Sequence, residues 1–230
     1  MNSKRALSLL SLAGLAVALV APLRPASTAA EDPIVALHRV SVIGEVDAKA
    51  LANCKEALIA FSKARPGLGY TDVVADTVTG QEVLVVQHWA SLAAAEDGGL
   101  ALDGSELEKA LAGLGEPQPA RFFRALRLQN YDRGTAGYTE VVVFRTKPGT
   151  TRDDHLALFD AAEAGFSKEE GVRGHALGLS PDGHWVHHVG WKSAEDFARA
   201  SKALMRDAGV RSWITSLDFG RFVQRHGAPE

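Results

Sequence analysis

One pattern occurs twice in this 230-residue chain and constrains its fold more than any other feature. An apolar run with strand-like spacing ends in Trp-x-Ser, and a helical pattern begins at the serine, once at Trp89 and Ser91 and again at Trp191 and Ser193. Serine is a favoured N-cap residue, and Asp196 stands three positions after Ser193, as in a capping box. The chain therefore contains the same strand-to-helix joint twice, which indicates an internal repeat.

The elements around each joint follow the same order in both halves. In the first half we predict a strand at 34–43, a helix from Asp47 to about Lys63, strands at 70–78 and 83–89, a helical segment that breaks at Gly98-Gly99 and restarts at a capping box at 105–108, and a strand at 121–128. In the second half we predict a strand at 138–146, a helix that begins at Thr151 or Asp153, a strand at 173–180, the strand that ends at Trp191, a helix from Ser193 to about Met205, and a closing strand at 213–223. Each half therefore has the order β-α-β-β-α-β.

This order is that of a ferredoxin-like unit, in which two helices cover one face of a four-stranded sheet. The other face is bare, and two units in tandem can bury both bare faces by packing sheet against sheet. We therefore predict an α+β fold of two ferredoxin-like repeats, at 31–130 and 138–230 with a linker at 131–137, that form a pseudo-dimeric α/β barrel. The protein is then either a monomer with this barrel or a homodimer.

The first 30 residues are typical of a secretory signal peptide. Lys4-Arg5 precedes an apolar run at 6–20, and small residues at 26–30 supply a cleavage pattern. The run approaches the length of a membrane span, so an uncleaved anchor is the alternative, but Pro22 and Pro25 break the helix early. We predict a periplasmic or secreted protein that has no membrane contact after cleavage.

Charge and cysteine content limit the function further. Cleavage after Ala30 removes three of the 25 basic residues and none of the 28 acidic ones, which leaves a formal net charge of −6. Nucleic-acid binding without sequence preference depends on neutralising phosphates, so we predict no nucleic-acid partner. The single cysteine, Cys54, shares a helical face with Leu51, Leu58 and Phe61, and we interpret it as a small core residue rather than a nucleophile.

Several short segments of the second half carry a family resemblance. They are Phe-Arg-Thr-Lys-Pro-Gly at 144–149, Gly171, Ser-Pro-Asp-Gly at 180–183 and Trp-Lys-Ser-Ala-Glu-Asp-Phe at 191–197. With them the chain resembles the antibiotic-biosynthesis-monooxygenase type of dimeric α/β-barrel domain, well over 138–225 and more loosely over 34–130. The resemblance implies a pocket between helices and sheet.

The same resemblance implies two kinds of activity. Some members of the family oxidise polyphenolic or quinol compounds with dioxygen and no bound cofactor, and others bind and degrade haem. The Trp at the end of the third strand lines the pocket in several members, and this role carries over to Trp191 and Trp89. The degrading members bind haem through a His about three helical turns beyond that Trp, where this chain has Ser201 and Gly99. The resemblance therefore favours an enzyme without a cofactor.

The hairpin between two strands of the second half places its histidines on the sheet. Ser-Pro-Asp-Gly-His at 180–184 suits a type I turn that closes a three-residue loop, which pairs Leu177 with His187. A two-residue loop would move one strand to the opposite face. In the three-residue register, one face carries His175, Leu177, Trp185, His187, Val189 and Trp191, whereas His188 and Gly190 point to the other.

Three interpretations of His187 compete. The imidazole can act as a general base that takes a proton from a phenol or enol before dioxygen reacts. It can instead bind a metal or a haem iron, or it can be a buried histidine that a neighbour satisfies. Neither His187 with His188 nor His184 with His188 is spaced to chelate an ion, so we predict no metal.

Other polar residues fit the pocket less well. Tyr70 and Asp72 can add polar groups to it. His88 is the first-half counterpart of Gly190, which suggests that the two pockets have diverged. His155 and His226 are more typical of solvated positions.

The sequence thus predicts a secreted monooxygenase-like protein that oxidises a small aromatic or quinol compound without a cofactor. The alternative is a periplasmic barrel protein that binds a small ligand, or haem through His175 or His187, without catalysis. The candidate catalytic residues are His187 and Trp191, and the candidate substrate-binding residues are His175, Trp185, Trp89 and Tyr70.

Overall fold

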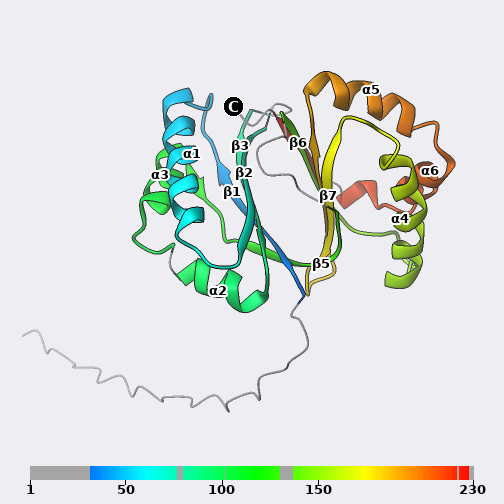
Figure 1. Ribbon diagram of the computed structural model, residues 1–230, viewed down its shortest axis with the longest axis horizontal. Helices are drawn as coiled ribbons and strands as arrows, with labels where there is room; N and C mark the ends of the chain where they lie inside the picture. Colours follow the sequence, from blue (N-terminus) through cyan, green and yellow to red (C-terminus); the bar gives the residue numbers. More distant parts are fainter. Residues whose placement is uncertain (1–31, 77–79, 101, 130–136, 222, 228–230) are drawn as a thin grey trace, which may run out of the picture. The chain divides into compact units, whose positions relative to one another are not determined.

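The first half of the chain folds into an antiparallel sheet in the order β2-β3-β1-β5 (Figure 1). The computed structural model describes residues 32–76, 80–100, 102–129, 137–221 and 223–227. The signal peptide predicted at 1–30 and linker positions 131–136 lie outside these residues. The elements of the first half are β1 (Ile34–Ser41), α1 (Ala48–Lys63), β2 (Leu68–Ala75), β3 (Glu82–Trp89), α2 (Leu92–Leu100), α3 (Glu106–Leu114), the short β4 (Glu116–Pro117) and β5 (Arg121–Gln129).

The second half repeats this strand order as β7-β8-β6-β9. Its elements are β6 (Tyr138–Phe144), α4 (Arg152–Phe166), β7 (Val172–Leu179), β8 (Trp185–Trp191), α5 (Ala194–Leu204), α6 (Ala208–Thr215), the 3-10 helix η1 (Phe219–Arg221) and β9 (Val223–Gly227). Even the β-bulges correspond, because the register shifts after Leu68 in β2 and after Val172 in β7. The predicted pair of ferredoxin-like units is confirmed.

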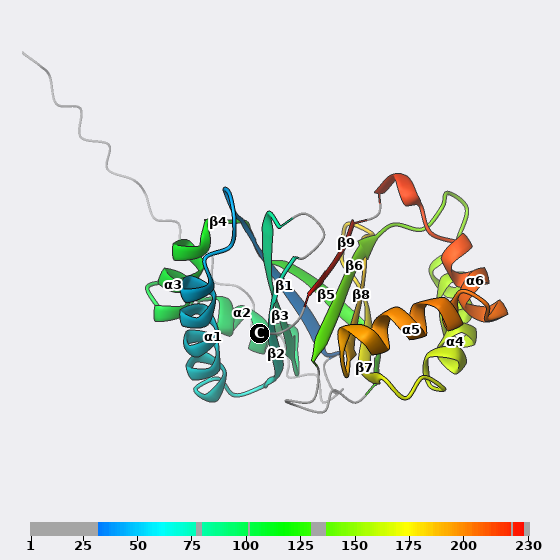
Figure 2. The ribbon, with the colours of Figure 1, turned by 90° about the horizontal axis from the view of Figure 1, so that it is seen from above.

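One strand joins the two halves into a single sheet. β5 pairs with β1 along its first part and with β7 along its second part. Helices α1–α3 cover the outer face of the first four strands and α4–α6 the outer face of the others (Figure 2). The inner faces pack on one another through an apolar cluster: Val35, Leu37, Val74, Leu84, Val86, Phe123, Ala125, Val141, Ala176 and Val186. The predicted α/β barrel is therefore formed within one chain.

The barrel is nearly closed on its other side. Gly227 of β9 lies so close to β2 that a Cβ there would overlap the carbonyl oxygen of Ala75. Only a residue without a side chain allows this approach of the two edge strands. Among the described residues, no helix combines the length and the apolar content that crossing a bilayer requires.

Local capping explains where the helices begin. The side chains of Asp47, Ser105 and Ser193 each accept a hydrogen bond from the backbone N–H three residues later, as predicted. Thr151, rather than Asp153, caps α4 and forms a capping box with Asp154. The predicted core position of Cys54 is also confirmed, since the residue is fully buried and its burial raises the pKa of the thiol to about 11.

One predicted element is wrong. The segment at 213–223 is not a strand. Its first part belongs to α6, which begins at the N-cap Asp207 and whose Val210 and Trp213 are buried at helical spacing, and the closing strand begins only at Val223. The helical segment after Ser91 is interrupted slightly later than predicted, since α2 includes Gly98 and Gly99 and ends at Leu100, and α3 begins after Ser105 as predicted. A Cβ at Gly98 would overlap the Trp89 ring, so glycine allows α2 to pack there.

Candidate functional site in the first half

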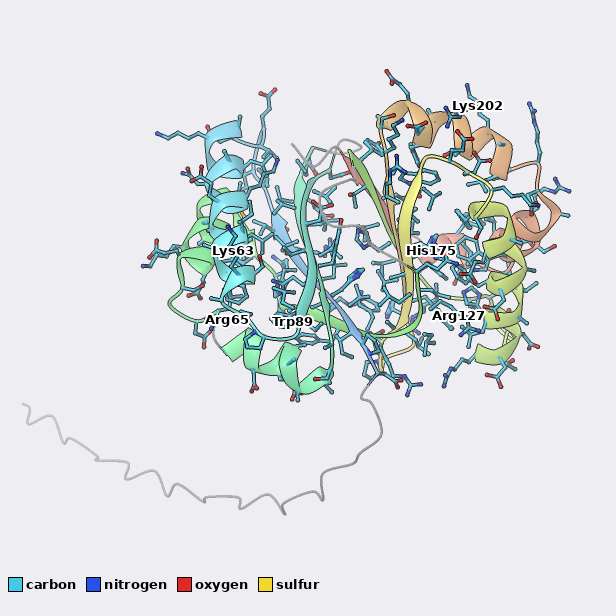
Figure 3. The ribbon with its side chains drawn as sticks, viewed as in Figure 1. Lys63, Arg65, Trp89, Arg127, His175 and Lys202 are labelled. Atoms are coloured by element: carbon cyan, nitrogen blue, oxygen red, sulfur yellow. The ribbon has the colours of Figure 1, made fainter. Side chains whose placement is uncertain are left out.

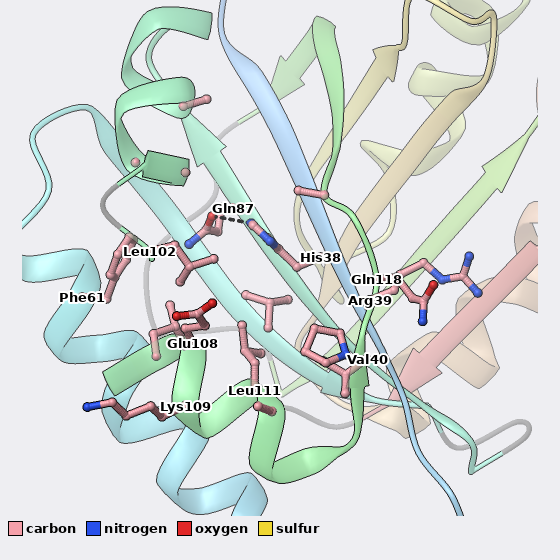
Figure 4. Close-up of a pocket in the computed structure, with 18 of the residues that line it drawn as sticks. His38, Arg39, Val40, Phe61, Gln87, Leu102, Glu108, Lys109, Leu111 and Gln118 are labelled. Carbon is pink, nitrogen blue, oxygen red and sulfur yellow. Dashed lines mark hydrogen bonds between the residues drawn. The ribbon is translucent and has the colours of Figure 1, made fainter. Parts of the chain in front are cut away.

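A cavity of about 400 Å³ lies between the sheet of the first half and its helices (Figure 4). Most of its lining is apolar, as is usual for small-molecule sites, whose volumes are about 300–1,000 Å³. The sheet contributes His38, Val40, Val85, Gln87 and Phe122, and the helices and the loop after α2 contribute Phe61, Ala95, Leu102, Leu107 and Leu111. The cavity is therefore large enough and apolar enough for a small aromatic compound.

His38 and Gln87 form the polar centre of this lining. His38 Nε2 lies 3.0 Å from Gln87 Oε1 (Figure 4), and the Gln87 side chain is buried whereas His38 is half-buried. An amide oxygen only accepts hydrogen bonds, so His38 Nε2 carries the proton and Nδ1 holds the lone pair. Burial lowers the pKa of His38, which keeps the ring neutral at neutral pH. The pair thus presents an acceptor on His38 and an amide donor on Gln87.

Charged side chains border the cavity but are engaged by neighbours. Glu108 Oε2 accepts from the backbone N–H of Gly104 at 2.6 Å, and Lys109 Nζ lies 2.6 Å from Glu106 Oε1. Arg39 forms an ion pair with Glu82. These contacts hold the charges near the rim, so the interior is suited to a largely uncharged ligand.

Glycines in α2 keep the cavity open. Gly98 and Gly99 both line it, and a Cβ added at Gly99 would meet no atom within 4 Å. The Trp89 ring lies directly against Gly98 and is 3 % exposed. Figure 3 shows Trp89 on the sheet beside the helices of the first half. Among the described residues, its Nε1 has no hydrogen-bond partner. Trp89, predicted to bind substrate, therefore supports this wall of the cavity from behind.

The equivalent layer of the second half is filled with rings. His187 holds the position of Val85, four residues before the strand-ending Trp, and it is 2 % exposed. The rings of Phe159, Phe166 and Trp213 pack on it at centroid distances of 5.4, 5.4 and 5.1 Å. The predicted sheet register is confirmed, because Leu177 pairs with His187 and the His175 ring lies 6.1 Å from His187 on the same face.

His175 and His187 are buried neutral bases. His175 Nε2 lies 3.1 Å from Gln129 Oε1 and 3.5 Å from Glu163 Oε1, and burial lowers the pKa of His175 to about 4 (Figure 3). Burial, followed by the nearby His175 and His155, holds the pKa of His187 well below its usual value. Within the described part of the chain, His175 Nδ1 and His187 Nε2 have no hydrogen-bond partner. Their predicted roles in binding and catalysis stay predictions.

The two predicted tryptophans of this half are core residues. The Trp185 ring packs on His155 at 4.4 Å, and the Trp191 ring packs on Phe197 at 5.6 Å. Trp185 and Trp191 are 3 % and 1 % exposed. The structure thus places Trp191 and His187 on the same helix-covered face, and the catalytic role of each stays a prediction.

His155 was predicted to be solvated, and this is wrong. It is fully buried, with Nδ1 3.1 Å from Ser216 Oγ, and Nε2 accepts a hydrogen bond from Trp213 Nε1 at 3.3 Å. Four residues after the cap Thr151, it faces the sheet where Leu51 stands in the first half. The sequence pattern did not reveal that both ring nitrogens of His155 would have hydrogen-bond partners inside the core.

Tyr70 lies inside the barrel, on the sheet face opposite the cavity. Its hydroxyl donates to Asp72 Oδ2 at 3.2 Å, and Thr139 of the second half donates to the same oxygen at 2.6 Å. Beside them, His88 Nε2 lies 3.1 Å from His188 Nδ1. Burial raises the pKa of Tyr70, with a further contribution from the Asp72 charge, and burial lowers the pKa of His88 to about 3. This cluster links the two halves, and the predicted substrate-binding role of Tyr70 stays a prediction.

No cluster of three or more His, Cys, Asp or Glu side chains is arranged to hold a metal ion in the described ranges. The residue that sequence reasoning missed is His38. The sequence did contain a sign of it. His38 is a polar residue on the strand face that otherwise carries apolar side chains, namely Ile34, Ala36, Val40 and Val42. A polar residue on the buried parity of a strand marks either a satisfied core pair or a site.

Comparison with known proteins supports the fold. No protein-family model and no curated protein matches the sequence. Among solved structures, a protein named "Putative monooxygenase" from Fusobacterium nucleatum subsp. nucleatum is similar with a TM-score of 0.69 and 11% identity, covering 87% of this chain and 94% of that chain. An anthrone oxidase-like protein has a TM-score of 0.54 and 17% identity over 85% of this chain and 90% of its own. A heme-binding protein from Thermus thermophilus has a TM-score of 0.55 and 11% identity over 86% and 91%.

At these identities the likeness concerns the fold. The chain has the α/β-barrel architecture that these monooxygenase-like and heme-binding proteins share, and chlorite dismutases are further structural neighbours.

Proposed function

We propose that the cavity of the first half binds a small aromatic or quinol compound and that the protein oxidises it with dioxygen. The observation that carries this proposal is the His38–Gln87 pair inside an apolar cavity of about 400 Å³. A neutral imidazole with a free lone pair next to an apolar ring site is suited to removing a proton from a phenol or enol. The names of the monooxygenase and anthrone oxidase-like neighbours agree with such a reaction.

The chemistry follows from the two polar groups. His38 Nδ1 takes the hydroxyl proton of the substrate, and Gln87 holds His38 in the tautomer that leaves Nδ1 free. In the substrate anion, negative charge is delocalised onto a ring carbon that carries hydrogen, and dioxygen adds there to form a carbon–oxygen bond. The resulting peroxide takes the proton back from the imidazolium, and its O–O bond breaks as water leaves with the hydrogen of that carbon. The ring is thereby oxidised to a quinone, with one oxygen atom of dioxygen in the new carbonyl group and the other reduced to water. The apolar walls exclude water from the anion and strengthen its interaction with the imidazolium.

The second half offers a second place for the same reaction. There His187 is the base, next to Trp191, with His175 and Trp185 around it, as the sequence predicts. The unpartnered His187 Nε2, buried among aromatic rings in the described part of the chain, favours this alternative.

Oxygen consumption with a panel of quinols separates the two places. We expect His38→Gln to lower the rate on the order of a hundredfold, the usual scale for a general base, while the matched His187→Gln variant keeps it. The opposite result would move the reaction to the second half. A wild-type protein that binds quinols by calorimetry without consuming oxygen would leave the non-catalytic binding alternative.

Haem binding through His175 or His187 fits the structure less well. The rings of Phe159, Phe166 and Trp213 pack against the His187 ring. Packed in this way, they leave no room for a porphyrin whose iron would bind a nitrogen of His187. No step of the proposed reaction involves haem. Added haem should leave the absorbance spectrum of the protein as a simple sum, and a shifted Soret band lost in His187→Ala would contradict this.

We also propose that the protein acts after export. The apolar run at 6–20 and the small residues at 26–30 support this. The N-terminal sequence of protein isolated from its native cells should begin near residue 31, and an intact Met1 would contradict cleavage.

A further inference from the structure

A second cavity, of about 570 Å³, lies where the two halves meet over β5. Its walls come from the start of β1 and the residue Asp32 before it, the first residue of α2, the first half of β5, and the end of β7 with the loop that follows. They are Asp32, Ile34, Leu92, Phe122, Arg124, Leu179, Ser180 and Pro181. The lining is apolar apart from one ion pair and one serine, so this groove suits an apolar chain with a charged end.

Phe122 lines both cavities. A residue that borders two spaces is part of the wall between them, and Phe122 is only partly buried. One face of α2 also runs past both, because Leu92 lines the groove, and Ala95 and Gly99, three and seven residues on, line the inner cavity. The two cavities are therefore neighbours along one helix and share the Phe122 side chain.

Arg124 supplies a positive charge at the far side of this wall. It follows Phe122 by two residues on β5, on the same sheet face and about 7 Å further along the strand. Its Nη1 lies 3.3 Å from Asp32 Oδ2, and the side chains are 45 % and 58 % exposed. An ion pair this exposed is weak, so the carboxylate of a ligand can take the place of Asp32.

We propose that the two cavities form one two-part site for an aromatic compound with an apolar arm that ends in a carboxylate. The aromatic head occupies the inner cavity beside His38, the arm passes the Phe122 ring, and the carboxylate binds Arg124. The placement of the head rests on the proposed function, whereas the groove, Phe122 and Arg124 are independent of any catalysis.

Calorimetric binding of 1-naphthol and of 1-naphthols with a 4-(ω-carboxyalkyl) arm of three to eight carbons tests this site. Binding of 1-naphthol itself tests the inner cavity. In the wild-type protein, an arm long enough to reach Arg124 should tighten binding about tenfold or more, because several methylene groups become buried. Arms too short to pass Phe122 should give no gain.

Three variants sharpen the result. Leu92→Trp should narrow the groove, so it should remove the gain from the arm and keep 1-naphthol binding, because Leu92 lines the groove and not the inner cavity. Arg124→Gln should weaken only the carboxylate ligands, by about threefold, the scale of an exposed ion pair. The matched control is Arg121→Gln, since Arg121 is on the same strand but on the opposite sheet face and pairs with Asp182. Equal affinity for armed and bare naphthols in the wild-type protein, or a gain that survives Leu92→Trp, would overturn the two-part site. Tight armed binding without oxygen consumption would support it while contradicting the oxidase proposal.

Discussion

The helix-covered layers of the two halves are built from the same elements and filled in opposite ways. The first layer holds a cavity of about 400 Å³, and the second holds histidines packed among phenylalanine and tryptophan rings. Four residues before the strand-ending Trp, the first half has Val85 and the second has His187. A duplicated unit can therefore leave a cavity in one layer and fill the other with side chains.

The helices account for much of this difference. In the second half, Trp213 of α6 packs on the rings of Phe144, Phe159 and His187. In the first half, Leu111 of α3 holds the corresponding position, six residues after the N-cap, and borders the cavity. A large ring fills one layer, and a smaller side chain leaves the other hollow.

The largest expected effect is the loss of the Trp213 ring. Trp213→Ala removes a buried indole from the filled layer and the donor to His155, so we expect the free energy of unfolding to fall by about 3–5 kcal/mol. The matched first-half variant is Leu111→Ala, which should cost only about 2 kcal/mol because Leu111 already borders empty space. Denaturant unfolding measures both, and equal losses would contradict the contrast between a filled and a hollow layer.

Lowering the pH should destabilise the filled layer of the second half more than the hollow layer of the first half. Burial lowers the pKa of His155 and of His175 to about 4, below the ordinary value of 6.5. The unfolded chain then binds more protons than the folded one, so this contribution to stability is complete above pH 6.5 and is lost as the pH falls toward 4. For each of these two histidines, the free energy of unfolding falls by about 1 kcal/mol per pH unit in that window.

Unfolding measured from about pH 7.5 to about pH 4.5 tests this expectation. Asp72 opposes the trend, because burial raises the pKa of its carboxyl group and its protonation favours the folded state as the pH falls. A His175→Asn variant should flatten the profile, whereas His38→Gln should change it less, since His38 is only half-buried. A flat profile in the wild-type protein would contradict the neutral, buried histidines.

Local patterns in the sequence predicted the strand order, the helix caps and the face shared by His175 and His187. Each of these depends on nearby residues: a cap on the next turn, and a register on its hairpin. The cavity beside His38 depends on the volumes of side chains from three helices, which no local pattern contains. The segment at 213–223 was predicted as the strand that closes the second unit, but the Asp207 cap and tertiary packing on α4 favour a helix there.

Filling the hollow layer should remove ligand binding without loss of stability. Gly99→Leu places a side chain where no atom lies within 4 Å and replaces a helical glycine, so the free energy of unfolding should stay equal or rise by about 0.5–1 kcal/mol. The affinity for 1-naphthol should fall at least tenfold, the order expected when a ligand loses its cavity. The control is Ser201→Leu at the corresponding position of α5. If Gly99→Leu binds 1-naphthol like the wild type, the cavity is not the binding site.

The smallest expected effect comes from copying a first-half residue into the filled layer. His155→Leu introduces the residue that the first half has at Leu51, so an apolar side chain replaces the imidazole. The variant loses the hydrogen bonds to Ser216 and Trp213 but buries no titratable ring, and at about pH 7.5 we expect a change within about 1 kcal/mol. At about pH 5 the same variant should be more stable than the wild type, because its unfolded chain gains no proton at this position. Chemical unfolding of the variant and of the wild type at the two pH values measures this change in their relative stability. A variant that is less stable at both would mean that His155 holds the layer together through its hydrogen bonds, and the two halves would then differ in what stabilises them as well as in what they leave open.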